Sequence, residues 1–199
     1  MNLYKDLPLY YISIDDAAGM EAIALVENPA VEVDFLKFDA EPKRIFSKDE
    51  ERHIITGVAI MAGKPIYRYD PYDGEYYVVF TKEVIEQLVL KYAKDNFFNK
   101  VNLQHDEEAV QDGIYMVESY FVDKKRGIAP KEIEAEDGSW IVSYKVENEA
   151  LWEEIKNSGV LKAFSIEGYF NMREECFSED EEDWLDQFLP KKKVNTQSH

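Results

Sequence analysis

Short apolar runs alternate with charged turns along most of this chain, a pattern that predicts many short strands and few helices. The nearly continuous apolar run Ile54–Met61 predicts a buried strand. Ile66–Tyr69 and Tyr76–Phe80 flank the turn residues Pro71–Gly74, and this arrangement predicts a β-hairpin. Ala22–Pro29 fits either a strand or a short helical turn. Further extended segments are expected over Leu9–Ile14, Val33–Phe38, Val101–Leu103, Gly113–Val122, Trp140–Val146 and Val160–Phe170.

Two segments have the apolar spacing and capping residues of helices. Thr81 is a good N-cap, and apolar residues recur at helical spacing behind it, so a helix is predicted over 82–95. Asn148 predicts the start of a second helix, Glu149–Lys156, which Ser158 and Gly159 close. The predicted fold class is therefore α+β, with mostly antiparallel strands and peripheral helices.

Charge and proline content suggest three regions. Residues 39–52 are charged and contain Pro42, so they are interpreted as a linker into the main body. We expect an N-terminal extension over 1–50 that packs on a core domain over 51–175. The final region, 176–199, is predicted to be an acidic helix followed by a flexible basic and polar tail.

Composition excludes several classes of partner. The chain of 199 residues carries 41 acidic and 23 basic side chains, and its net charge of −18 repels phosphate backbones, which argues against nucleic-acid binding. The single cysteine, Cys176, excludes an internal disulfide and suits a reducing compartment. We find no signal peptide and no apolar run of membrane-spanning length, so a soluble intracellular protein without a membrane partner is expected. No cofactor or metal is predicted.

His105 and Ser165 are the residues with the strongest catalytic potential. His105 follows the predicted strand Val101–Leu103, and an imidazole titrates near neutral pH, as a general base requires. Ser165 interrupts an apolar, aromatic-flanked segment, and Gly168 follows it, where a close backbone approach is feasible. The other two histidines, His53 and His199, are expected at the surface. The acidic loop around His105 leaves open a metal-binding or small-ligand β-domain.

Longer motifs resemble the XkdF-type phage prohead protease family. They are a strand ending in a His-Asp pair, a Val-Glu-Ser-aromatic strand, a Gly-Ser-Trp strand, a helix start of the form Val-x-Asn-Glu-x-Leu-Trp, and the segment FSIEGY around Ser165. Residues 21–38 also match the opening of such proteins, so the resemblance covers roughly residues 20–170. Ala163 stands where the family pattern usually carries glycine.

This resemblance implies a β-barrel-like core related to the HK97-type prohead proteases and herpesvirus assemblin. It also implies a serine endopeptidase in which Ser165 attacks the scissile carbonyl and His105 is the base. The implied substrates are the scaffold protein, N-terminal segments of the major capsid protein and the protease itself. The implied location is the host cytoplasm, inside the procapsid, and association into a homo-oligomer is left open.

The third catalytic residue and the activity itself stay open at this point. Glu118 is the first choice for the third residue, because strand 113–122 is expected to return beside the strand before His105. Asp123, Asp106 and Glu167 are the alternatives. A catalytically silent protein that acts in phage head assembly is the alternative to a protease.

Overall fold

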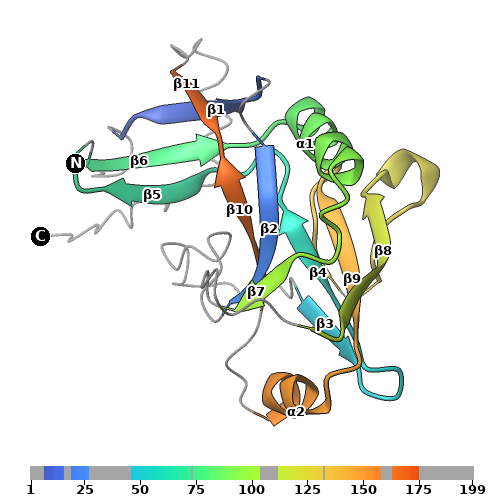
Figure 1. The fold of residues 1–199 in the computed structure, drawn as a ribbon. Coiled ribbons are helices and arrows are strands. Elements are labelled where there is room, and N and C mark those ends of the chain that lie inside the picture. Colours follow the sequence, from blue (N-terminus) through green and yellow to red (C-terminus); the bar gives the residue numbers. More distant parts are fainter. Residues whose placement is uncertain are drawn as a thin grey trace, which may run out of the picture.

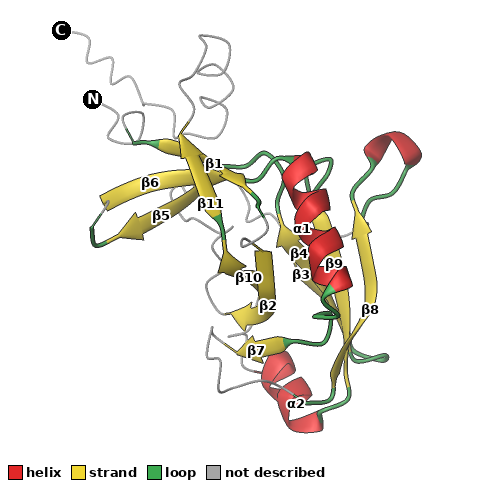
Figure 2. Cartoon of the chain, turned by 45° about the horizontal axis from the view of Figure 1, so that its top comes forward, coloured by secondary structure: helices red, strands yellow, loops and turns green. Residues whose placement is uncertain are grey.

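The protein folds as a mixed α+β structure with more strand than helix, which confirms the predicted fold class (Figure 2). The computed structural model describes residues 7–15, 19–26, 46–72, 74–103, 112–131, 133–157 and 163–174. The expected segment Val33–Phe38 and the C-terminal region 176–199 lie outside these residues.

The described strands and helices follow the hydrophobic pattern closely in type and extent. The strands are β1 (Leu9–Ser13), β2 (Gly19–Val26), β3 (Phe46–Asp49), β4 (Ile54–Ile60), β5 (Ile66–Asp70), β6 (Gly74–Val79), β7 (Val101–Leu103), β8 (Ile114–Phe121), β9 (Trp140–Val146), β10 (Ala163–Tyr169) and β11 (Asn171–Glu174). The helices are α1 (Lys82–Lys94), α2 (Glu149–Asn157) and a 3-10 turn over Lys124–Arg126.

The strands form three sheets (Figure 1). Their orders are β11-β1-β6-β5, β10-β2-β7 and β3-β4-β9-β8. Two neighbouring pairs, β1 with β6 and β2 with β7, run parallel, and the other pairs are antiparallel. The predicted hairpin is confirmed, because β5 pairs with β6 and Asp70 lies opposite Gly74 at its turn.

The expected barrel-like closure is not confirmed. β10 passes near β4, but these two strands form no ladder among the described residues, so the three-stranded and second four-stranded sheets are not joined into a barrel. The chain instead leaves the three-stranded sheet at its end, and β11 pairs with β1 in another sheet (Figure 1). The strand before β11 is β10, which contains Ser165 and lies in the middle of the molecule (Figure 1).

Both predicted helices form with the predicted caps. The Thr81 hydroxyl accepts a hydrogen bond from the Val84 N–H at 3.3 Å, and the Asn148 side-chain oxygen accepts one from the Leu151 N–H at 3.1 Å. Each cap satisfies a backbone donor that the first helical turn leaves without a partner. Helix α1 packs on β2, and helix α2 packs on β9.

One large apolar core lies between the three-stranded sheet, the second four-stranded sheet and α1. Tyr92 of α1 and Tyr144 of β9 are buried in it, and neither hydroxyl makes a hydrogen bond of ordinary geometry within the described residues. Burial raises the pKa of both phenols, and their proximity raises the pKa of Tyr144 further. Both rings therefore stay neutral at physiological pH.

Two expectations need correction, and one open alternative is decided. Residues 46–49, inside the expected linker, form β3 because they pair with β4 despite their polar sequence. The segment that fitted either a strand or a turn is strand β2, held on both sides by β10 and β7. β8 was expected beside β7, the strand before His105, but it pairs with β9. The strand that pairs with β7 is β2.

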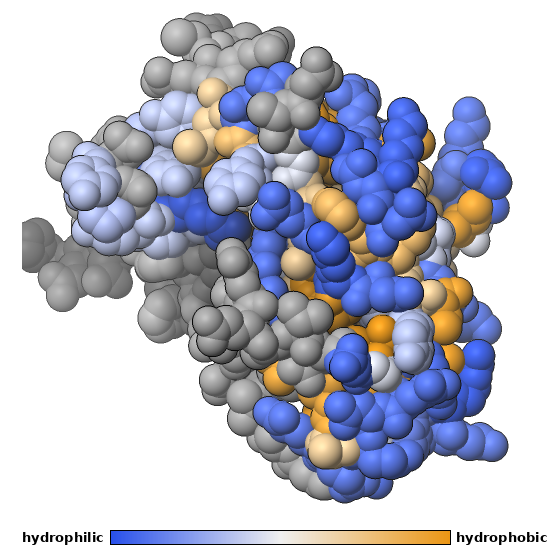
Figure 3. Space-filling view, viewed as in Figure 1, coloured by the Kyte–Doolittle hydropathy of each residue, from blue (hydrophilic) through white to orange (hydrophobic). Residues whose placement is uncertain are grey.

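The face of the molecule seen in Figure 3 is largely hydrophilic where its residues are described. Figure 3 shows polar side chains over most of one face, with hydrophobic ones showing through between α1 and α2. Of the helices described, none combines the length and the apolar character that crossing a bilayer requires.

Candidate active site

Ser165 lies near the centre of β10, in register with a residue of the neighbouring strand β2 and, beyond it, with a residue of β7. It stands opposite Ala24 of β2, which in turn stands opposite Asn102 of β7. Residues in register across a sheet project from the same face. Ser165, Ala24 and Asn102 therefore form a row across the three-stranded sheet, which we call the serine row.

The two faces of this sheet differ in chemistry. The residues that alternate with the serine row project into the core, where Ile23, Leu25 and Phe164 are buried. The opposite face carries the serine row and Glu167, together with the small residue Ala22. The strand period of two thus separates an apolar face from a face on which polar side chains stand among alanines.

The serine row is well enclosed. Ser165 is 8 % exposed and Asn102 is 2 % exposed, while Ala24 is fully buried. Among the described residues, the Ser165 hydroxyl has no hydrogen-bond partner. A buried serine usually bonds its hydroxyl to a nearby backbone or side-chain group, so Ser165 departs from the usual pattern within the described residues.

Asn102 and Glu167 are joined across β2. The Asn102 Nδ2 atom donates to Glu167 Oε2 at 2.7 Å, a short bond because the acceptor is charged. The Asn102 Oδ1 atom is buried and has no hydrogen-bond partner in the part of the chain that the structure describes. Sequence analysis missed Asn102, although an amide in the apolar three-residue strand Val101–Leu103 is the signal that could have identified it.

Gly168 shapes the strand that carries Ser165, but not in the way its sequence position suggested. The β10–β2 register shifts between Glu167 and Gly168, and a Cβ atom on Gly168 would lie 2.1 Å from the Gly19 carbonyl oxygen. Gly168 therefore permits the close approach of the protein's own strand β2, which keeps β10 paired beyond the bulge.

The predicted base lies outside the described part of the chain. His105 and the alternative carboxylate Asp106 both fall in the segment 104–111, which follows β7 directly. Their pairing with Ser165 stays a prediction.

Glu118, the first choice for the third residue, lies in a different sheet from Ser165. It accepts a hydrogen bond from the Ser143 hydroxyl at 2.5 Å, and Ser143 Oγ lies 2.8 Å from Thr56 Oγ1. Because Ser143 gives its only proton to the carboxylate, Thr56 must donate to Ser143. These three polar groups link β8, β9 and β4, so Glu118 has a structural partner of its own.

Two other residues considered from the sequence also have structural contacts. Asp123 caps the turn after β8, where its carboxylate accepts from the Arg126 N–H at 2.9 Å. His53, expected at the surface, is half-buried and stacks on Trp152 of α2 with ring centroids 4.5 Å apart. Of the carboxylates named from the sequence, Glu167 is the one that the described structure places on Ser165's own strand and face.

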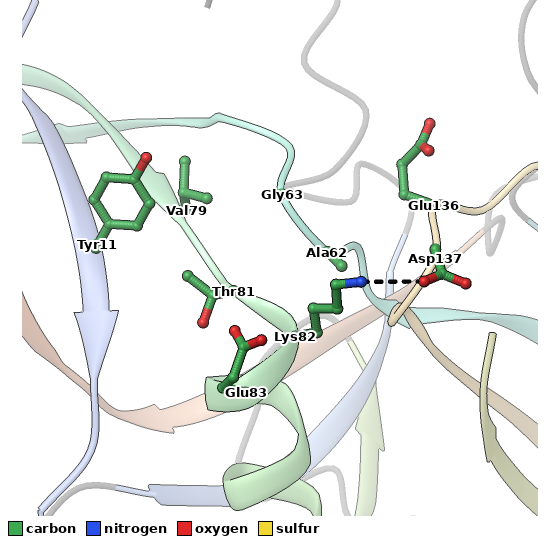
Figure 4. Close-up of a pocket in the computed structure, with 9 residues that line it drawn as sticks. All are labelled: Tyr11, Ala62, Gly63, Val79, Thr81, Lys82, Glu83, Glu136 and Asp137. Atoms are coloured by element: carbon green, nitrogen blue, oxygen red, sulfur yellow. Dashed lines mark hydrogen bonds and ion pairs between the residues drawn. The ribbon is translucent and has the colours of Figure 1, made fainter. Parts of the chain in front are cut away.

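A cleft of about 390 Å³ lies elsewhere, at the start of α1 (Figure 4). Its polar groups already have partners: Lys82 Nζ lies 3.1 Å from Asp137 Oδ2, and a hydrogen bond from the Lys124 N–H, followed by the Lys82 contact, lowers the pKa of Asp137. None of the residues found to line it belongs to β10, β2 or β7. The cleft is therefore separate from the serine row.

These side chains together indicate a class of protein. A serine whose hydroxyl has no hydrogen bond within the described residues, on an enclosed sheet face beside a linked amide and carboxylate, suits a serine hydrolase of β-rich fold. A family profile described as "Putative phage serine protease XkdF" matches residues 42–174, and the chain belongs to this family of phage serine proteases. Comparisons with curated proteins and with solved structures gave no significant match.

The matched segment contains Ser165, Asn102 and Glu167 but begins after β2. The strand that separates Ser165 from Asn102 is therefore contributed by residues upstream of the family match.

Proposed function

We propose that this protein is a serine endopeptidase of phage head maturation, with Ser165 as the nucleophile and His105 as the general base. The observation that supports it most directly is the position of Ser165 within the matched family segment, on the polar face of the three-stranded sheet with its hydroxyl free of a described partner. Its substrates are the scaffold protein, N-terminal segments of the major capsid protein and the protease itself, inside the procapsid in the host cytoplasm.

The proposed chemistry proceeds in two halves. His105 removes the proton of Ser165 Oγ as that oxygen attacks the scissile carbonyl, and it then gives the proton to the leaving amine. An acyl-enzyme on Ser165 remains. Water, deprotonated by the same imidazole, hydrolyses this ester and regenerates the serine.

The candidate carboxylates differ in how well their contacts support a role as the third catalytic residue. Glu118 and Asp123 make structural hydrogen bonds in β8 and the turn after it, whereas Glu167 lies on the Ser165 face and holds Asn102. The contacts favour a role for Glu167 at the site over one for Glu118.

The test is co-expression of the full chain with the scaffold and major capsid proteins of its phage. Intact-mass spectrometry would compare the wild type with Ser165→Ala and His105→Ala. His53→Ala and Ser119→Ala are matched controls, since the structure gives His53 and Ser119 contacts with tryptophans in the fold.

Cleavage at defined positions by the wild type and both controls, lost in Ser165→Ala and His105→Ala, would support the proposal. Uncut partners in all samples, with the protein found in assembled heads, would instead establish a silent assembly protein. Cutting by Ser165→Ala at the wild-type rate would move the active site elsewhere.

A further inference from the structure

We propose that Glu167 is a positioning residue for Ser165: its side chain holds strand β10 to β7 by bonding Asn102 across β2. What the site requires of Glu167 is this hydrogen bond and not its negative charge. The inference rests on the proposed function, because it concerns how Ser165 is held for reaction. It distinguishes Glu167 from the third catalytic carboxylate that the sequence left open.

Sheet pairing holds the strand of Ser165 from one side. Among the described residues, β10 is an edge strand of the three-stranded sheet, with β2 as its neighbour and β7 beyond (Figure 1). The β10–β2 register shifts between Glu167 and Gly168. Such a bulge disrupts the ladder locally and bends the strand. The regular pairing beside Ser165 therefore ends at Glu167, two residues beyond the proposed nucleophile.

The side-chain bond gives β10 a second attachment. Asn102 Nδ2 donates to Glu167 Oε2 at 2.7 Å, so the two side chains together reach from β7 to β10. Glu167 stands opposite Ala22 of β2, and Asn102 stands opposite Ala24. Residues in register project from the same face of a sheet, so the bond crosses β2 where that strand presents two methyl groups. The two edge strands are thereby tied to each other as well as to β2.

Burial makes this bond important for the geometry around it. Asn102 is 2 % exposed, and its Oδ1 atom has no partner in the described part of the chain. Without Glu167, the buried amide would lose the hydrogen bond that its nitrogen makes there, and an unpaired buried donor destabilises the arrangement that leaves it so. The donor needs an acceptor, and a neutral amide oxygen accepts as a carboxylate does. The bond therefore does not depend on the charge of Glu167.

Ser165 is close enough to Glu167 to feel any movement of β10. The two residues alternate with Ile166 and project from the same face, about 6.6 Å apart along the strand. A displacement of reacting groups by about 1 Å can slow catalysis by about 100-fold. Loss of the bond should therefore slow the reaction of Ser165 and leave the reacting groups themselves unchanged.

The experiment measures the labelling of Ser165 by a fluorophosphonate probe, in the full-length chain co-expressed with the scaffold and capsid proteins. Labelling forms a P–O bond at Ser165 Oγ, breaks the P–F bond and releases fluoride, while the serine proton passes to the base. A series of probe concentrations separates the maximal labelling rate from the concentration that gives half of it. Thermal melting checks that each variant is folded.

The variants separate the bond from the charge. Glu167→Gln keeps an acceptor for Asn102, so its maximal rate should stay within about threefold of the wild type. Glu167→Leu keeps the bulk and removes the bond, so its maximal rate should fall by about 10- to 100-fold at an unchanged half-maximal concentration. Asn102→Leu should slow labelling equally, and combining the two leucines should slow it no further, because both remove one interaction. Glu21→Leu, at an exposed position of β2, is the matched control.

The outcomes are distinct. A rate kept in Glu167→Gln and lost in the leucine variants supports the inference, and if those variants do not fold, Glu167→Gln decides alone. A loss in Glu167→Gln equal to that in Glu167→Leu, or wild-type rates in folded leucine variants, overturns it and leaves the protease proposal standing. A wild type that is neither labelled at Ser165 nor able to cut its partners overturns both.

Discussion

At the scale of single residues, several positions that identify the family serve the fold. Ser139, in the Gly-Ser-Trp motif, is fully buried, and its Oγ accepts from the Ala62 N–H at 3.0 Å. Trp140 fills the core and donates from Nε1 to Ser119 at 3.0 Å. Two residues of this motif therefore serve packing and hydrogen bonding in the fold, and motif membership alone does not indicate catalysis.

Replacing Ser139 with alanine should destabilise the protein without altering its chemistry. The Ala62 N–H would lose its acceptor in a buried position, which costs about 1–3 kcal/mol. Urea denaturation measures the loss, and fluorophosphonate labelling below the transition should be unchanged. A loss of labelling in fully folded Ser139→Ala would contradict this assignment.

Gly168→Ala should cost about 3 kcal/mol, because the added methyl would meet backbone atoms of β2 that cannot move independently. Gly127→Ala is the control. Gly127 has a positive φ of 73°, but a Cβ atom added there would meet no described atom within 4 Å beyond the adjoining residues, so only backbone strain of about 1 kcal/mol is expected. Equal losses in the two variants, measured by denaturation, would show that the close approach of β2 and β10 carries no cost.

At the scale of elements, β2 has the most influence on the site. It pairs with β10 on one side and β7 on the other, and its residues Ile23, Ala24 and Leu25 are fully buried. Without it, the strands carrying Ser165 and Asn102 would lose their shared neighbour. The family match starts at residue 42, so the N-terminal part of this chain completes a sheet that the matched segment alone leaves open.

A fragment beginning at residue 42 is therefore expected not to fold into the native structure. It would lack the buried residues of β2 and the backbone partners of β10 and β7. Circular dichroism and thermal melting would compare it with a fragment beginning at residue 7, which keeps both β1 and β2. Cooperative melting of the shorter fragment at the temperature of the longer one would show that β2 is dispensable.

At the scale of the whole molecule, the core contains two phenols that must stay neutral. Burial raises the pKa of Tyr92 and Tyr144 above their value in the unfolded chain, which is about 10. A group with a raised pKa contributes its full stability below the unfolded pKa and loses it as the pH rises toward the folded pKa. Stability should therefore fall as the pH rises past about 10.

The measurement is the free energy of unfolding in urea at pH 8 and pH 11. The double variant Tyr92→Phe/Tyr144→Phe should lose less stability over this interval than the wild type does. Tyr72→Phe, at a side chain that is 97 % exposed, is the control and should leave the loss unchanged. An equal loss in the core double variant would indicate that other groups cause the alkaline unfolding.

The sequence alone determined the local structure to a large extent. The capping residues Thr81 and Asn148 and the apolar spacing behind them predicted both helices nearly to their ends. Strand period and turn chemistry predicted the β5–β6 hairpin and the strands β4, β7 and β9. These features depend on neighbours within a few residues, so the local sequence contains their physical cause.

The tertiary structure decided what no local pattern could. The pairing of β8 with β9, the insertion of β2 between β10 and β7, and the polar strand β3 all depend on contacts between distant segments. The placement of Glu118 by Ser143, and the pairing of Asn102 with Glu167, follow from those strand partners. The sequence thus predicted Ser165 as a candidate and indicated the family. Which polar side chains share the sheet face of Ser165 was determined by strand pairing and register, because pairing and register depend on the packing of the whole core.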